Sequence, residues 1–167
     1  MKKKIQRNYL EINSLVDLKD SKNFPEGYLV ELVYPFNFQL NKFFYKNVGK
    51  KHHWIDRLIW TEKQWTEYVS SETIKTYILK KNEDLAGYYE LIIHDDKKEV
   101  EIAYLGLLEE YQNKKLGSYL LSSAIKNSFM SNPNTVWVHT CSLDHKNALT
   151  NYTARGMRIF KKEIITV

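Results

Sequence analysis

The spacing of hydrophobic residues changes period between residues 101 and 130. An apolar run from Ile102 to Leu108 predicts a buried strand. A polar segment follows over Glu109–Lys115. Beyond it the apolar residues recur at helical spacing, at Leu116, Tyr119, Leu120, Ala124 and Ile125. The pattern therefore predicts a strand that turns sharply into a helix of roughly residues 115–130.

The second half of the chain gives regular signals on both sides of this unit. Alternation and β-branched or aromatic content predict strands at 73–80, 86–94, 100–108, 135–141 and 157–167. The first three are joined by short turns, which is typical of an antiparallel meander. Asp144 is expected to cap a further helix, with Gly156 just beyond its end.

The first seventy residues give weaker signals. Residues 5–12 read as an edge strand, and residues 28–34 read as a strand ended by Pro35. Asn37 is placed to cap a helix that runs to about Asn47 and is stopped by Gly49. Thr61 and Gln64 form a capping box that opens a short helix through Val69.

These elements predict one domain over residues 1–167 with an α/β (α+β) fold. Strand 99–108, helix 115–130 and strand 135–141 form a crossover unit, so we expect those two strands to be parallel. The other strand pairs should be antiparallel. The expected architecture is a mixed, mostly antiparallel central sheet with helices on both faces.

Composition narrows the class of protein. The chain has 167 residues and a net charge of +5, with lysines scattered rather than gathered in one stripe, which is weak evidence for nucleic-acid binding. Cys141 is the single cysteine, so there is no internal disulfide, and a reducing compartment is favoured. No apolar segment follows the N-terminal lysines, and no run approaches transmembrane length. We therefore expect a cytoplasmic protein that binds no nucleic acid or membrane.

The turn between the predicted strand and helix has the chemistry of an anion site. A helix N-terminus presents unpaired N–H groups and a partial positive charge. Lys114 and Lys115 add charge, Gly117 allows close approach to the backbone, and Gln112 and Ser118 complete the turn. The phosphate loop GxxxxGK[ST] and the dinucleotide fingerprint GxGxxG are both absent. The turn therefore predicts a different kind of phosphate or pyrophosphate cradle.

The segment Gln112-Asn113-Lys114-Lys115-Leu116-Gly117-Ser118 resembles the Q/R-x-x-G-x-G/A turn of the GNAT acetyltransferase superfamily, with Lys115 in place of the first glycine. The element order extends this resemblance over about residues 28–165. It implies an acyl-CoA N-acyltransferase fold in which the amides of this turn hold the pyrophosphate of acetyl-CoA. It also implies that the preceding strand splays from its parallel neighbour, leaving Leu107 and Leu108 to pair with the pantetheine arm. Gly106 fits a bulge or a close backbone approach there.

The resemblance also suggests catalytic residues. In some family members a glutamate eleven positions before the glutamine of the turn is the general base, and Glu101 stands there. Such a base is needed because an ammonium must lose a proton before its nitrogen attacks a thioester. Glu90 on the neighbouring strand is the second candidate, and Glu101 could instead face solvent or pair with a lysine.

The end of the chain resembles the family's closing motif. Asn147, Ala148 and Tyr152, followed by Gly156, repeat its N-x-x-A-x-x-x-Y-x-x-x-G pattern in looser form. There the tyrosine can protonate the leaving thiolate, so the resemblance implies this role for Tyr152 and cofactor contacts for Asn147 and Tyr152. The alternative is a tyrosine that only packs in the core.

Other residues leave alternatives open. Trp54, Arg57, Trp60 and Trp65 either line an acceptor pocket or pack in the core. His139, Cys141 and His145, together with Asp144, are residue types that could bind zinc. A Cys–His nucleophile is a further option. The resemblance nevertheless favours direct acetyl transfer without a metal, with acetyl-CoA as cosubstrate and a small-molecule or peptide amine as acceptor. A homodimer, a non-catalytic acyl-CoA-binding or regulatory domain and, less well supported, an RNA-binding domain stay open.

Overall fold

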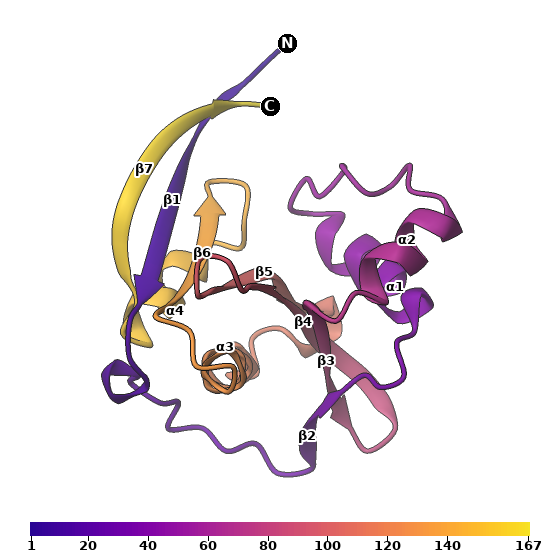
Figure 1. Ribbon diagram of the computed structural model, residues 1–167, viewed down its shortest axis with the longest axis horizontal. Coiled ribbons are helices and arrows are strands. Elements are labelled where there is room, and N and C mark those ends of the chain that lie inside the picture. Colours follow the sequence, from indigo (N-terminus) through magenta and orange to yellow (C-terminus); the bar gives the residue numbers. More distant parts are fainter.

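A seven-stranded sheet forms the centre of the computed structural model, which describes residues 1–167 (Figure 1). Its strands are β1 Lys4–Ile12, β2 Tyr28–Leu32, β3 Ile74–Lys81, β4 Asp84–His94, β5 Glu99–Leu107, β6 Thr135–Cys141 and β7 Arg158–Thr166. The helices are α1 Phe38–Gly49, α2 Glu62–Val69, α3 Leu116–Phe129 and α4 Ala148–Ala154, with short 3-10 turns η1 Leu15–Asp17 and η2 Glu109–Tyr111. The predicted element order is confirmed.

The strands lie in the order β2-β3-β4-β5-β6-β1-β7. Only β5 and β6 are parallel, as the crossover through α3 predicts, and every other pair is antiparallel. The expectation that β1 is an edge strand is wrong, because β1 pairs with β6 on one side and β7 on the other. Leu10 and Ile12, which are fully buried, reflect this central position.

Helices cover both faces of the sheet, and neighbouring residues of β4 contact helices on opposite faces. Adjacent residues of a strand point to opposite faces. Tyr88 stacks on Phe44 of α1 with ring centroids 4.8 Å apart, whereas Tyr89 bonds Ser123 of α3 at 2.9 Å between hydroxyl oxygens. The larger core lies between the sheet and α3 with α4, and the smaller core lies under α1.

The two parallel strands stay together over only a short stretch. Glu99, Val100 and Glu101 of β5 pair with β6, and the pairing ends at Glu101 opposite Trp137. Both strands continue beyond this point, so they diverge. A bulge at Ala103, which has no partner on β4, lies just past the divergence. The sequence suggested a bulge at Gly106, and the observed bulge lies three residues before that position.

Gly106 instead meets the other prediction, a close backbone approach. A Cβ atom there would lie 2.3 Å from Cγ1 of Val48 in α1, so only glycine fits without a shift. The first helix thus packs directly on the strand that diverges from β6. No helix of the chain is long and apolar enough to cross a membrane.

The predicted helix ends are mostly confirmed. Asn37 caps α1, Thr61 and Gln64 form a reciprocal capping box on α2, and Gly156 follows α4 with φ of +100°. The predicted cap at Asp144 is wrong, because α4 begins only at Ala148 and Asn147 is its N-cap. The Asp144 carboxylate instead accepts bonds from the Cys141 N–H at 3.1 Å and from the Thr140 hydroxyl.

Candidate active site

A cavity of about 1030 Å³ opens where β5 and β6 diverge. Its floor comes from the diverging strands, and its sides come from the α1–α2 connection, the β6–α4 connection and the ends of β1 and β7. The turn before α3 and residues of α4 line its other end. One cavity therefore connects most of the segments that the sequence marked for chemistry.

The turn before α3 has the backbone of an anion cradle. Lys115 is the N-cap of α3 in the left-handed conformation, with φ of 61° and ψ of 23°. This is the position where the family pattern has glycine, and Asn113 has φ of 62° as well. A Cβ atom at Gly117 would meet only the Asn151 amide nitrogen, at 3.6 Å, so its surroundings are open. A ligand can therefore approach the first turn of α3 closely.

Side chains around the cradle hold its shape. Asn151 Nδ2 donates to the Gly117 carbonyl oxygen at 3.1 Å, which ties α4 to the first turn of α3. The Ser118 hydroxyl lies 2.9 Å from that of Ser21, so this side chain anchors an N-terminal loop rather than pointing freely at the cavity. Gln112 Nε2 donates to the Leu107 carbonyl oxygen at 3.4 Å. The cradle is thus fastened to β5, α4 and the loop after η1.

The backbone at the end of β5 corrects one predicted residue. The Leu108 N–H donates to Ala86 and its carbonyl accepts from Tyr111, so neither group is free for a pantetheine arm. Because bonded and non-bonded pairs alternate in an antiparallel ladder, Leu105 and Leu107 turn their N–H groups away from β4. They face the side where β6 has diverged. Leu107 therefore offers a backbone donor to the cavity and Leu108 does not.

Most of the predicted cofactor residues line the cavity: Leu107, Gln112, Asn113, Lys115, Leu116, Gly117, Ser118, Asn147 and Tyr152. Leu108 and Lys114 do not. The Lys114 ammonium lies over the Tyr111 ring, 5.5 Å from its centroid, on the outside of the turn. The Leu116 side chain is 1% exposed and belongs to the core, so only its backbone can contact a ligand.

Glu101 lies at the point where the parallel strands separate, and it lines the cavity. Its side chain is 16% exposed, and one carboxylate oxygen is 3.1 Å from Nε2 of His94 on β4. It thus neither faces open solvent nor pairs with a lysine. A mostly buried carboxylate at the cavity wall can accept a proton from a bound ammonium group.

Glu90, the second candidate base, lies outside the cavity. It is 0% exposed, and its carboxylate accepts bonds from Arg57 at 3.0 Å and 3.2 Å and from Asn41 at 3.0 Å. Burial raises the pKa of Glu90, whereas Arg57 and Asn41 act in the opposite direction. With every contact made inside the protein, Glu90 has no access to an acceptor amine. The family resemblance ranked Glu101 first, but the sequence alone could not show that Glu90 is enclosed, because the two glutamates lie on neighbouring strands.

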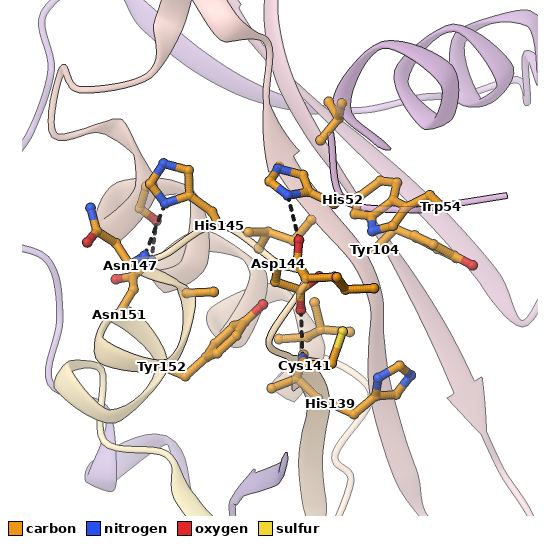
Figure 2. A pocket seen from close by; sticks show the side chains of 18 of the residues that line it. His52, Trp54, Tyr104, His139, Cys141, Asp144, His145, Asn147, Asn151 and Tyr152 are labelled. Atoms are coloured by element: carbon orange, nitrogen blue, oxygen red, sulfur yellow. Dashed lines mark hydrogen bonds between the residues drawn. The ribbon is translucent and has the colours of Figure 1, made fainter. Parts of the chain in front are cut away.

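Tyr152 reaches from α4 toward the loop that carries Asp144 (Figure 2). Its side chain is buried and belongs to the larger core, yet it also lines the cavity. Burial, with the nearby Asp144 carboxylate, raises the pKa of Tyr152. The phenol therefore stays protonated at neutral pH. Asn147, in the same view, is at the N-cap of α4 rather than inside the helix.

Residues 35–157 match the family model described as the acetyltransferase (GNAT) family. This match covers more than half of the chain. The chain belongs to the GNAT acetyltransferase family. The resemblance inferred from the cradle turn and the element order is thereby confirmed, as is the predicted fold. No curated protein matches the sequence.

Solved structures share the GNAT fold at low sequence identity. A GCN5-related N-acetyltransferase from Sphaerobacter thermophilus has 14% identity and a TM-score of 0.71 over 97% of this chain and 50% of that one. An aminoglycoside acetyltransferase from an uncultured soil metagenomic sample has 10% identity and a TM-score of 0.64, covering 80% of this chain and 90% of that one. A GNAT family protein from Streptococcus pneumoniae TIGR4 has 17% identity and a TM-score of 0.58, covering 78% and 87%.

The chain is shorter than several of the solved structures that share its fold. It spans between 50% and 62% of the length of four of them, one of which, from Staphylococcus epidermidis, is described as functionally unknown. At such identities the likeness shows the fold. The chemistry of this GNAT chain therefore has to be argued from its own residues.

The metal-like cluster does not form in this GNAT domain. His139, Cys141, His145 and Asp144 do not bring three or more ligands together in a group that could hold an ion. His145 instead lies near His52 at the cavity, with ring centroids 6.4 Å apart (Figure 2). Burial raises the pKa of the Cys141 thiol, which makes it a poor nucleophile at neutral pH.

Two of the four aromatic or basic residues expected at an acceptor pocket line the cavity, namely Trp54 and Arg57. Trp60 and Trp65 do not, because their rings pack on each other with centroids 4.9 Å apart and Trp65 is 1% exposed. The sequence reasoning missed Arg7, His52 and Asn151, which also line the cavity. Arg7 and His52 come from elements distant in sequence, and only the pairing of β1 with β6 could have indicated Arg7.

Proposed function

We propose that this chain is an acetyl-CoA-dependent N-acetyltransferase that moves an acetyl group directly to a primary amine. The observation that carries the proposal is the single cavity that joins the cradle, the free N–H of Leu107, the Glu101 carboxylate and the Tyr152 phenol. These are a site for an anionic cofactor, a backbone donor, a base and an acid. Family membership supports the same reaction class.

The residues present fit coenzyme A. GNAT proteins generally use acetyl-CoA, whose pyrophosphate needs amide donors and positive charge. The first turn of α3 offers unpaired N–H groups beside open space at Gly117, and the Lys115 ammonium is exposed next to them. The diverged strands leave the Leu107 N–H facing the cavity, which suits an amide-containing pantetheine arm. Acetyl-CoA would supply the activated acetyl group.

The chemistry that we propose needs one base, one donor and one acid. Glu101 takes a proton from the acceptor ammonium, which frees the nitrogen lone pair to bond to the carbonyl carbon. The Leu105 N–H, close to that of Leu107 on the side of β5 that faces the cavity, donates to the carbonyl oxygen as negative charge develops there. The carbon–sulfur bond then breaks, and Tyr152 gives its proton to the leaving thiolate. The second proton that the nitrogen loses as the amide forms restores the Tyr152 phenol. The acceptor is a small-molecule or peptide amine, and Trp54 and His139 are among the residues that line the cavity available to it.

Thiol release from acetyl-CoA with a panel of primary amines tests this function. The panel contains an amino acid, a polyamine, an aminoglycoside and a peptide N-terminus. We expect release that depends on one class of amine and that falls about 100-fold in Glu101→Gln with unchanged CoA affinity. The matched control is Glu99→Gln on the same strand, which lies outside the cavity and should keep its rate. Tight CoA binding without release for any amine would instead identify a non-catalytic acyl-CoA-binding domain.

A further inference from the structure

The Glu101 carboxylate has a partner that does not line the catalytic cavity. His94 Nε2 on β4 lies 3.1 Å from Glu101 Oε1. Glu101 lines the large cavity, whereas His94 lines a separate shallow surface depression together with Asp95, Lys98 and Glu99. The two residues lie on the same face of the sheet, because Glu101 pairs with Ile92 and His94 pairs with Glu99. The pair thus links the cavity to the surface beside it.

The His94 ring is held in place yet keeps access to water. It stacks on Trp137 with ring centroids 6.3 Å apart and planes inclined by 17°. Trp137 is the residue opposite Glu101 in the last parallel pair, so one indole fixes the imidazole against this carboxylate. The His94 side chain remains 31% exposed. The ring is therefore oriented toward Glu101 without being sealed from solvent.

We propose that His94 receives the proton that Glu101 removes from the acceptor and passes it to bulk water. This inference rests on the proposed acetyl transfer. Cofactor and acceptor in the cavity would cover the side of Glu101 that lines it. A second group on the outer side of the carboxylate provides a route that the substrates do not block.

The proton balance is simple. An N–H bond of the ammonium breaks and an O–H bond forms on Glu101. That O–H bond then breaks, and an N–H bond forms on Nε2 of a neutral His94 whose other nitrogen carries the ring proton. The imidazolium and the restored carboxylate face each other, and the imidazolium releases one proton to water. His94 does not touch the acceptor, so it is a positioning and relay residue rather than a catalytic one.

Other charged groups surround this imidazole without replacing its role. Glu99 is its cross-strand partner, and Asp95 and Lys98 belong to the turn beyond it. His139 lies on β6, two strands away, and Trp137 stands between it and His94. None of these groups is hydrogen-bonded to Glu101, whose one side-chain partner is His94.

His94→Gln tests the relay, because glutamine keeps a polar side chain but cannot take up a proton. We expect kcat to fall about 10-fold with KM for both substrates unchanged. Added imidazole should restore part of the lost rate, in proportion to its free-base concentration, because the site is open to water. Glu99→Gln, which changes the charge beside the same ring, should keep its rate and show no rescue. Melting temperatures of both variants confirm that they fold.

The Glu101→Gln background separates the relay from a structural role. If His94 acts only through Glu101, adding His94→Gln to Glu101→Gln should cause no further loss of rate. Imidazole should then rescue neither Glu101→Gln nor the double variant. Wild-type turnover in His94→Gln, or a loss that imidazole does not restore, overturns the relay and leaves the proposed transfer intact. A wild-type chain that releases no thiol with any amine overturns both.

Discussion

The Arg57 guanidinium and the Glu90 carboxylate form an ion pair that water hardly reaches. Arg57 Nη1 lies 3.0 Å from one carboxylate oxygen and 3.2 Å from the other, and the two side chains are 8% and 0% exposed. The Arg57 guanidinium carbon also lies within 4.2 Å to 5.7 Å of five aromatic ring centroids. Although burial opposes it, Glu90 raises the pKa of Arg57, so the pair is charged.

Removing one member of this pair should destabilise the fold strongly. Glu90→Gln leaves the Arg57 charge buried without a counter-ion, which should lower the free energy of unfolding by about 3–5 kcal/mol. Replacing both residues, as Arg57→Met with Glu90→Leu, should cost much less, since no unpaired charge remains. Urea unfolding measures each variant. The surface pair Lys63 and Glu67, 3.9 Å apart and largely exposed, provides the control, and Glu67→Gln should change little.

Cofactor affinity should depend on Gly117 more than on the lysines. Gly117→Glu fills the open approach to the first turn of α3 and adds negative charge, so CoA binding should weaken at least 10-fold. Lys114→Ala should cost less, about 1 kcal/mol at most, because its ammonium lies outside the cavity over Tyr111. Calorimetry with folded variants measures both. Unchanged affinity in Gly117→Glu would remove the cradle as the pyrophosphate site.

Lys115 adopts a left-handed backbone conformation that is unfavourable for lysine but not for the glycine of the family pattern. Because a left-handed backbone disfavours a Cβ atom, Lys115→Gly should raise the free energy of unfolding by about 1 kcal/mol. The same change should weaken CoA binding, since one ammonium next to the cradle is lost. Asn113→Gly is the matched control, because Asn113 has nearly the same φ but asparagine tolerates this region better. A smaller stabilisation at residue 113 than at 115 would support this account.

The crossover unit could be predicted from sequence because its signals are local. The apolar run before Leu108 and the helical spacing after Leu116 specify a strand and a helix, and the crossover through this helix makes β5 and β6 parallel. The pairing of β1 with both β6 and β7 could not be predicted in this way. This pairing joins residues more than 120 positions apart. The alternation that includes Leu10 and Ile12 predicts a strand but does not indicate which strands pair with it.

In the candidate site, too, some residue positions could be predicted from the sequence and others could not. The turn motif placed Gln112, Lys115 and Gly117 at the cavity, because a motif fixes backbone position. Whether a side chain on a strand faces a cavity or an ion pair depends on what packs against it. Asn41 and Arg57 from the α1–α2 region enclose Glu90, whereas the divergence of β6 opens the space before Glu101. Both facts come from tertiary packing.

His139 should make stability depend on pH. Burial, together with the Arg7 charge, lowers the pKa of His139 below its ordinary value of 6.5, although Glu101, Asp144 and Glu163 act in the opposite direction. The unfolded chain therefore binds this proton more readily than the folded one. Stability from this group is present above pH 6.5 and is lost as the pH falls through the lower folded value.

His139→Gln should remove part of that loss. Urea unfolding at several values between about pH 5 and pH 7 should give a flatter dependence for this variant than for the wild type. His53→Gln changes an exposed histidine and should leave the slope as it is. An equal slope in wild type and His139→Gln would show that another group governs the acid sensitivity.

Tyr152→Phe separates chemistry from packing, because it deletes one hydroxyl and keeps the ring. Tyr152 belongs to the core cluster and also lines the cavity, so both roles have a structural basis. If the residue only packs, the lost hydroxyl should change stability by about 1 kcal/mol or less and leave turnover unchanged. If it protonates the leaving thiolate, turnover should fall roughly 10-fold to 1000-fold while CoA affinity stays level.

We expect the second result, since the ring extends toward the loop of Asp144 at the cavity, and burial keeps the phenol protonated (Figure 2). The deficit should also depend on the leaving group. An acyl donor with a more acidic thiol needs less proton transfer as the carbon–sulfur bond breaks, so its rate should fall less in Tyr152→Phe. Tyr89→Phe is the matched packing control, because its hydroxyl bonds Ser123 and Asn127 away from the cavity. Wild-type turnover with a lowered melting temperature in Tyr152→Phe, matching Tyr89→Phe, would leave Tyr152 as a residue of the core.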